Sequence, residues 1–221
     1  MAVKSSIKTD RLYWLGRYSE RVYTTIMYFS DSYDKMIENG AEYEQFCKRF
    51  DIPNIYTGSD DFLRSYPFGT DNPDSIINNL YRAYDNAIEL REEISSSSLS
   101  YIQLAIYSIS KAAESEAPLI EFQKICDNIL AFWGCIDDII EDENTRNLIK
   151  VGKRIERIDL YGRLRMGRED LRREVMRLAG RIDRCAIRYN KKTVETLLEL
   201  VEEPTIDHDR IVYEVDRILE V

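Results

Sequence analysis

Two short stretches of the sequence place a carboxylate beside a guanidinium in the same pattern. They are Gly16-Arg17-Tyr18-Ser19-Glu20-Arg21 and Gly152-Lys153-Arg154-Ile155-Glu156-Arg157, each with a glycine, then a basic residue, then Glu-Arg at the fifth and sixth positions. Two glutamates brought together in this way could act as general acid and base, or bridge metal ions inside a helical bundle. Glu20 and Glu156, with their arginines, are therefore the first candidates for chemistry.

Both chemistries meet an objection in the neighbouring residues. Carboxylate-bridged metal sites in bundles use Glu-x-x-His, but Tyr23 and Asp159 stand three positions after the two glutamates. Adjacent guanidinium groups favour the ionised carboxylate and lower its pKa, away from the range that a general acid requires. We expect no metal and no cofactor here, and we keep an enzyme or small-ligand-binding bundle built on the Glu-Arg helices as an alternative.

The glycine of each stretch predicts a close contact between two helices. A glycine inside a helix costs about 1 kcal/mol relative to alanine, so its position needs an offsetting gain such as close backbone approach. Neighbouring side chains diverge on a helix, so the two helices would exchange partners, Glu20 with Arg157 and Glu156 with Arg21. We interpret the two stretches as an internal pseudo-repeat with reciprocal ion pairs across a pseudo-two-fold axis.

The helix face that carries Arg17 and Glu20 is not plainly solvated, because Tyr13, Met27 and Tyr28 share it. Buried charges must be paired, since leaving one partner alone costs several kcal/mol. A structural ion-pair network is the favoured interpretation, and a ligand or partner site is the alternative. The candidate binding residues of the two helices are Tyr13, Trp14, Arg17, Glu20, Arg21, Lys153, Glu156 and Arg157.

Other reactive residue types are sparse. The four cysteines are Cys47, Cys126, Cys135 and Cys185, and they include no CxxC pair. The first ten residues lack the apolar core of a signal peptide, so we interpret the cysteines as reduced, mostly buried thiols of a cytoplasmic protein. His208 is the single histidine. We find no nucleotide loop, nucleophile–base pair or metal-ligand set, and the acidic cluster at residues 137–143 lacks calcium-loop spacing.

Charge is distributed unevenly along the chain. Residues 146–192 hold 16 Lys or Arg against 6 Asp or Glu, a local balance of +10; the whole chain carries −9, so the rest carries −19. Such asymmetry can mark a surface for a polyanion. The favoured interpretation is that basic helices pack beside acidic ones, because no aromatic platform accompanies the arginines. Polyanion binding stays as an alternative, with Arg163, Arg165, Arg168, Arg172 and Arg173 as its core.

Helices must position these residues, since helical periodicity covers most of the chain and no stretch alternates as a strand would. The first helix is predicted from Thr9-Asp10, which can cap it, to Gly40. Its apolar stripe is Leu15, Val22, Ile26, Phe29, Tyr33 and Ile37. A short helix follows at 43–50, and the proline-containing stretch 51–73 is predicted to be irregular.

Asn72-Pro73 resembles a capped helix start, and the serines at 95–98 predict a break in the helix that follows. Further helices are predicted at residues 99–113, 119–140, 145–166, 169–189 and 193–201, with a last one after Pro204. We predict an all-α fold, a single bundle of seven to nine helices in one domain over residues 1–221. No stretch approaches the roughly 20 apolar residues of a membrane span.

Three segments resemble the alpha-E family, bacterial helical domains named for a Glu-Arg motif. Residues 12–21 resemble its opening signature, residues 148–164 its second, and residues 71–96 its central segment, in family order. The sequence departs from the family pattern at a few positions. Lys153 stands where the family often has arginine, and Asp10-Arg11, Ser97 and Ser98 also differ from the residues usual in the family. The central segment adds Arg82, Asn86 and Arg91 to the binding candidates.

The resemblance implies an association with ATP-grasp proteins, which join carboxylates to amines, and implies no activity of its own. The leading hypothesis is a non-catalytic accessory or scaffold bundle that binds an ATP-grasp-type peptide ligase or its peptide substrate. A membrane partner is not expected, nucleic acid is not favoured, and self-association stays open.

Overall fold

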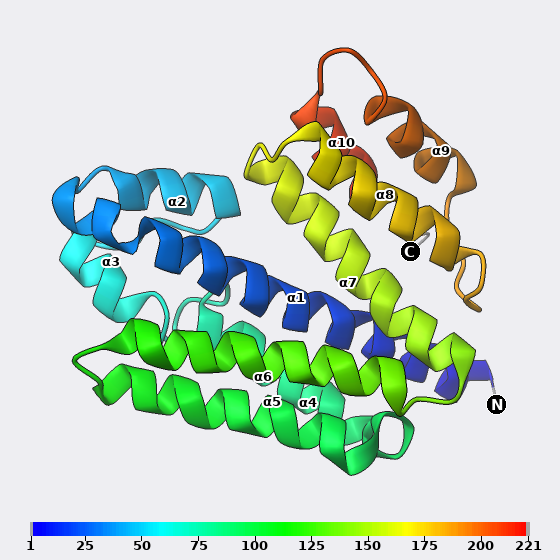
Figure 1. Cartoon of the computed structure of the whole chain (residues 1–221), viewed down its shortest axis with the longest axis horizontal. Coiled ribbons are helices and arrows are strands. Elements are labelled where there is room, and N and C mark those ends of the chain that lie inside the picture. Colours follow the sequence, from blue (N-terminus) through cyan, green and yellow to red (C-terminus); the bar gives the residue numbers. More distant parts are fainter. Residues whose placement is uncertain (1, 220–221) are drawn as a thin grey trace. The chain divides into compact units, whose positions relative to one another are not determined.

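A computed structural model describes residues 2–219, with side chains from residue 7 onward. These residues form ten α-helices and one isolated antiparallel bridge, Tyr189 with Leu219, and no strand, which confirms the all-α prediction. The helices are α1 (Ala2–Glu38), α2 (Glu42–Phe50), α3 (Ser59–Ser65), α4 (Ile76–Glu89), α5 (Arg91–Glu114), α6 (Pro118–Asp138), α7 (Glu143–Arg163), α8 (Arg168–Ile182), α9 (Lys191–Leu200) and α10 (His208–Val215) (Figure 1). In this described part of the chain, no helix has the length and apolar character needed to cross a membrane.

Backbone contacts divide the chain into two compact units. The first unit combines the residues up to Glu20 with residues 141–221, and the second holds residues 21–140. Helix α1 passes from the first unit into the second between Glu20 and Arg21. The assignment of residues 1–221 to one domain stays a prediction.

The first unit is organised around α7. Helices α8 and α10 pack on α7, and α9 packs on both α8 and α10 (Figure 1). Asp142 caps α7 by accepting a hydrogen bond from the Thr145 amide, and Asp207 caps α10 in the same way. The core combines Tyr13 of α1 with aliphatic side chains spaced three and four apart on the other helices, such as Leu171, Val175 and Leu178. This spacing places one apolar stripe of each helix in the interior.

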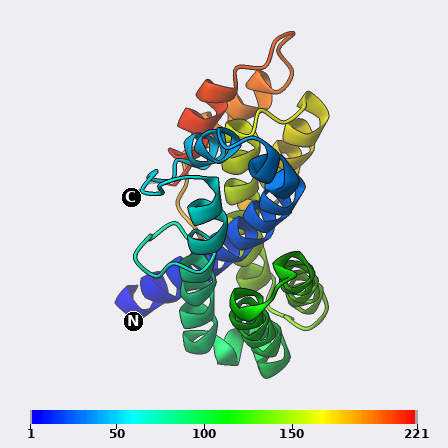
Figure 2. The same ribbon diagram turned by 90° about the vertical axis from the view of Figure 1, so that its left-hand side faces the viewer.

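The second unit is built on the antiparallel pair α5 and α6, which lie side by side in two perpendicular views (Figures 1 and 2). Its core is rich in aromatic rings around Phe29, which contacts Phe46, Phe62 and Phe122 at centroid distances of 5.8, 6.0 and 5.7 Å. Such edge and tilted contacts stabilise beyond the area they bury. The predicted break at residues 95–98 is confirmed, because Ser95 adopts φ 72° and ψ 155° inside α5.

Several predicted boundaries are wrong. Helix α1 is already helical at Ala2, so Thr9-Asp10 lies inside it, and α4 begins at Ile76 with Ser75 as its cap. Asn72 instead closes a turn by accepting the Asp74 amide. The stretch 51–73 contains α3, the extra short helix that takes the count above nine. On the α1 stripe, Ile37 is exposed and Met36 takes the buried position, so the apolar face has turned by one residue.

Candidate functional site

The two motif glycines lie where α1 and α7 come closest within the first unit. A Cβ built on Gly16 would lie 2.0 Å from the carbonyl oxygen of Ile149, and one built on Gly152 would lie 2.0 Å from that of Tyr13. Both distances are far below any normal contact. Only hydrogen-sized side chains fit at these two positions, as the helix-contact hypothesis requires.

Ion pairs flank this contact. The Arg157 Nε donates to Glu20 at 2.5 Å, and the Arg17 Nε donates to Glu156 at 2.6 Å. Lys153 lies 4.0 Å from Glu20. The exchange of partners between helices is therefore seen for Glu20 with Arg157. Glu156 pairs with Arg17, which lies one helical turn before Arg21, the partner that we expected. Arg21 belongs to the second unit, so its pairing with Glu156 stays a prediction. The internal pseudo-repeat also stays a prediction.

Aromatic rings surround Arg17. Its guanidinium lies 5.2 Å from the centroid of the Trp14 ring and 3.3 Å, through Nη1, from the Tyr13 hydroxyl. Trp14 also stacks on Tyr18 at 5.2 Å and keeps 40% of its surface exposed. Burial works against the charged form of Arg17, but Glu156 and Tyr13 together raise the pKa of Arg17. The Arg17 cation is thereby held beside the buried Tyr13 and the partly exposed Trp14.

A third buried glutamate, Glu174 of α8, extends the network. Its carboxylate accepts a short hydrogen bond from Arg154, lies 3.9 Å from Arg157, and pairs at 3.0 Å with Arg177. We define the Glu-Arg network as Arg17, Glu20, Lys153, Arg154, Glu156, Arg157 and Glu174. Glu174 is missing from the sequence-based candidates, although its position between Leu171 and Leu178, on an apolar stripe, is a readable signal of a buried charge.

The cations of α7 repel one another. Burial first, and then the neighbouring Arg157, Arg154 and Lys150, lower the pKa of Lys153 to about 7, against the opposing pull of Glu20. Burial and the nearby Arg181 and Arg154 lower the pKa of Lys150 to about 8. These shifts arise because a charged group loses hydration and meets like charges, both of which favour its neutral form.

The structure brings seven of the predicted site residues into one place and the rest into the second unit. Tyr13, Trp14, Arg17, Glu20, Lys153, Glu156 and Arg157 meet at the α1–α7 contact. Arg21 is the first residue of the second unit. Arg82 and Asn86 are half-buried and lie one turn apart on α4, and Arg91 is exposed at the start of α5.

The geometry limits what this site can do. Glu20 is 0% exposed and Glu156 is 1% exposed, so a substrate has no direct access to either carboxylate. Within the described residues, no three His, Cys, Asp or Glu side chains are grouped to hold a metal ion. His208 contacts the Met166 carbonyl oxygen at 3.0 Å, and burial raises the pKa of the Cys126 thiol to about 12, which suppresses its thiolate.

The match to a family model follows this geometry. Residues 5–204 match Alpha-E, described as a predicted alpha-helical domain with a conserved ER motif. The chain belongs to the Alpha-E family. Glu-Arg occurs twice in the sequence, at 20–21 and 156–157, and both occurrences fall inside the matched residues of this Alpha-E protein. No curated protein and no solved structure matches it significantly.

Proposed function

We propose that this Alpha-E protein is a non-catalytic accessory or scaffold module that binds an ATP-grasp-type peptide ligase, or the peptide substrate of that ligase, in the bacterial cytoplasm. The observation that carries the proposal is the burial of Glu20 and Glu156, each held by an arginine of the other helix. Breaking such a buried pair costs about 3–5 kcal/mol, so these groups are committed to holding α1 against α7. The phosphate chemistry then belongs to the partner.

The exposed part of the motif is Trp14, whose ring stacks on the half-buried Tyr18; we call these two rings the aromatic shelf. An exposed tryptophan that is fixed by stacking and by a cation loses little conformational entropy on binding, which suits it to anchor an interface. The motif would thus combine a buried structural half with an exposed binding half.

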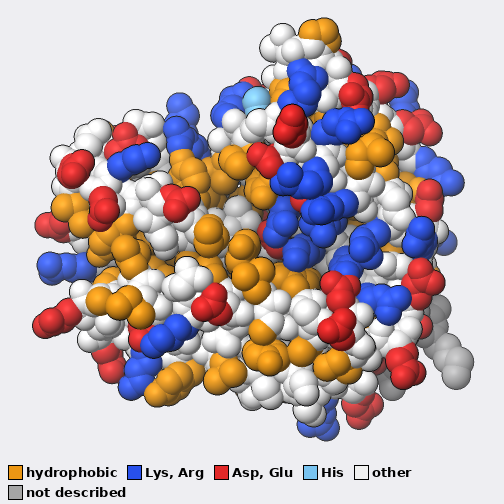
Figure 3. Space-filling model, viewed as in Figure 1, with side chains coloured by type: hydrophobic (Ala, Val, Ile, Leu, Met, Phe, Trp, Pro, Cys, Tyr) orange, Lys and Arg blue, Asp and Glu red, His pale blue; other side chains and the backbone are white. Residues whose placement is uncertain are grey.

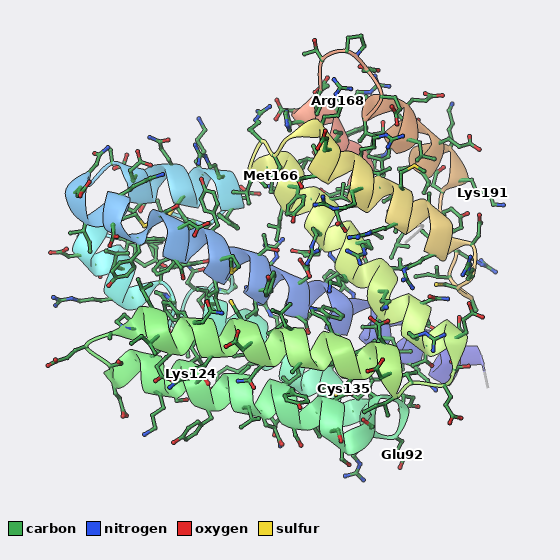
Figure 4. All side chains as sticks on the ribbon, viewed as in Figure 1. Glu92, Lys124, Cys135, Met166, Arg168 and Lys191 are labelled. Atoms are coloured by element: carbon green, nitrogen blue, oxygen red, sulfur yellow. The ribbon has the colours of Figure 1, made fainter. Side chains whose placement is uncertain are left out.

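Polyanion binding by residues 146–192 is the second candidate function, but the residues first expected to carry it are already engaged within the protein. The five arginines first expected at its core have protein partners. Arg163 pairs with Asp159, Arg165 with Asp209, Arg172 with Glu202 and Arg173 with Asp170. Arg168, which is labelled in Figure 4, donates to the carbonyl oxygens of Val201 and Pro204. Basic side chains nevertheless gather over α7 and α8 (Figure 3), which keeps the candidate in place. An enzyme built on the Glu-Arg helices is less favoured because its carboxylates are covered.

A tagged pull-down tests the leading proposal. The wild-type chain is compared with Trp14→Ala and with a control, Tyr213→Ala, which removes another exposed aromatic side chain of the first unit. We expect wild type and the control to capture an ATP-grasp protein and Trp14→Ala to lose most of it, with all three equally folded by circular dichroism. Robust turnover by the purified chain alone, or recovery without any ATP-grasp protein, contradicts the proposal.

A further inference from the structure

A groove runs between the antiparallel helices α5 and α6 in the second unit. Its lining comes from one face of each helix, with residues spaced three and four apart. The residues are Leu104, Tyr107, Ser108 and Lys111 of α5 and Glu121, Lys124, Asp127 and Asn128 of α6. The groove has a volume of about 490 Å³, and its apolar side chains are open to solvent, since Leu104 is 48% and Tyr107 62% exposed. We call this surface the hairpin groove.

The lining of the hairpin groove favours a protein occupant over a small molecule. Sites for small molecules are mostly apolar cavities that bury most of the ligand. Here half of the lining side chains are charged, and hydrophobic side chains continue along the same helix pair (Figure 3). One of them is Ile120, which is 61% exposed. Exposed apolar side chains rimmed by polar ones mark protein interaction surfaces.

Two opposite charges of the groove lie at the same level but do not pair with each other. A three-residue turn centred on Glu116 joins the helices, and Lys111 and Glu121 are each five residues from it. Lys111 lies over the Tyr107 ring at 5.5 Å and has no carboxylate partner among the described residues. Glu121 accepts from Lys124 through Oε1 at 2.7 Å, so its Oε2 is left for a further cation.

We propose that the hairpin groove binds a second copy of this chain, in a symmetric dimer that places α5 of each copy against α6 of the other. The inference does not rest on the ligase partnership, because it uses the second unit, whereas Trp14 belongs to the first.

A two-fold axis parallel to the helices, in the plane between the copies, pairs both charges. It places α5 opposite α6 of the second copy and keeps each residue at its level along the helices. In such an interface every contact occurs twice. Lys111 of each copy therefore meets Glu121 of the other. Tyr107 and Ser108 come level with Lys124 of the other copy, and an aromatic ring and a hydroxyl oxygen both accept a cation.

The size of this face is sufficient for a dimer. After the kink at Ser95, α5 offers about 20 residues, or about 30 Å of helix, and α6 offers a similar length. Two adjacent helices, each about 10 Å wide, present roughly 600 Å² per copy, so the dimer buries roughly 1,200 Å² in all. Specific interfaces begin at about 1,000 Å². Because the area is near this lower limit, we expect association at about 10–100 μM.

Charge complementarity favours a second copy over a different protein. The groove carries two cations and two anions, so it attracts neither a strongly acidic nor a strongly basic partner. Its arrangement is instead complementary to itself, because the cation and the anion left to pair stand on different helices at one level. The exposed pair of Lys124 with Glu121 is no obstacle, since such pairs contribute only about 0–1 kcal/mol.

Paired charge reversals test the dimer on the full chain, with sedimentation velocity at about 10–200 μM following the mass between 26.0 kDa and twice that value. Lys111→Glu brings two carboxylates together, and Glu121→Lys brings two ammonium groups together. Each variant alone should therefore dimerise at least about tenfold more weakly than wild type. An equimolar mixture of the two should associate as a heterodimer, because opposite charges then meet at both positions. The control is Lys35→Glu, which reverses an exposed charge of α1 in the same unit and should change the affinity less than about twofold.

Three results overturn the inference: wild type that stays at 26.0 kDa over this range, single variants that associate as wild type does, or a mixture that associates no better than its components. A monomeric wild type would leave the groove to a different protein. Tyr107→Ala is a second variant if a charge reversal fails to fold by circular dichroism, and it should weaken the dimer about tenfold. Ligase capture by Trp14→Ala is measured separately, so either proposal can fail without the other.

Discussion

Replacing Gly16 with alanine tests the helix contact directly. The added methyl carbon would lie 2.0 Å from the Ile149 carbonyl oxygen and 2.9 Å from the Lys153 amide nitrogen. In an α-helix these two backbone groups bond to each other, so the methyl group strikes the hydrogen-bond ladder of α7 rather than a side chain that can rotate away. The helices must separate by more than 1 Å to restore a normal contact.

Two opposing effects set the magnitude. Alanine is favoured over glycine inside a helix by about 1 kcal/mol. Overpacking costs typically 1–3 kcal/mol and occasionally more, and separation of the helices also stretches the pairs Arg157–Glu20 and Arg17–Glu156. We therefore expect Gly16→Ala to lower the free energy of unfolding of the first unit by about 2–4 kcal/mol.

Urea unfolding followed by tryptophan fluorescence measures this effect. Trp14 lies in the first unit and Trp133 in the second, so a Trp133→Phe background leaves a probe of the first unit alone. Gly180→Ala is the matched control, because a Cβ there meets nothing within 4 Å on an exposed face of α8. It should stabilise by about 0.5–1 kcal/mol. Equal, stabilising effects of both substitutions would refute the close contact.

Three further predictions concern other parts of the chain. Because burial lowers the pKa of Lys150 to about 8, the unfolded state binds more protons than the folded state above that pH, so the free energy of unfolding should rise with pH. Between pH 7.5 and 9.5 the free energy of unfolding of wild type should increase by about 1–2 kcal/mol relative to that of Lys150→Met, as measured by urea titration at each pH. Ser95→Gly should stabilise the second unit by about 1 kcal/mol, as measured by thermal melts followed at Trp133. Relief of the strained backbone at Ser95 should contribute about 1–3 kcal/mol, whereas loss of the hydrogen bond from the Ser98 amide to the Ser95 hydroxyl should cost a few tenths of a kcal/mol. Burial should keep Cys126 about a thousandfold less reactive than a free thiol toward iodoacetamide at pH 8, and mass spectrometry of native and denatured samples measures the ratio.

Periodicity was sufficient to predict most of the fold. Segments such as 43–50 and 145–166 carry an unbroken apolar stripe, and helices appear there within a few residues. The errors fall where local signals compete. Thr9-Asp10 and Asn72-Pro73 both resemble caps, but α1 continues through the first, and the second forms a turn three residues before α4. A cap motif shows that a helix can start, whereas packing decides whether it does.

The sequence predicted the part of the candidate site in which the two Glu-Arg motifs face each other. The glycine spacing indicated the α1–α7 contact and the exchange of Glu20 with Arg157. Glu174 was missed because its four arginine partners come from two helices, a relation that no local pattern encodes.

A double-mutant cycle on Arg17 and Glu156 tests the central claim, that the Glu-Arg residues form a buried structural network, most directly. Arg17→Met, Glu156→Met and the double variant are unfolded in urea with Trp14 as the probe. We predict that each single substitution costs about 3–5 kcal/mol, because it leaves one charge buried without its partner, and that the double variant costs at least about 2 kcal/mol less than the two single effects combined. Additive effects, or single variants as stable as wild type, would show that the pair does not hold the helices together and would contradict the account.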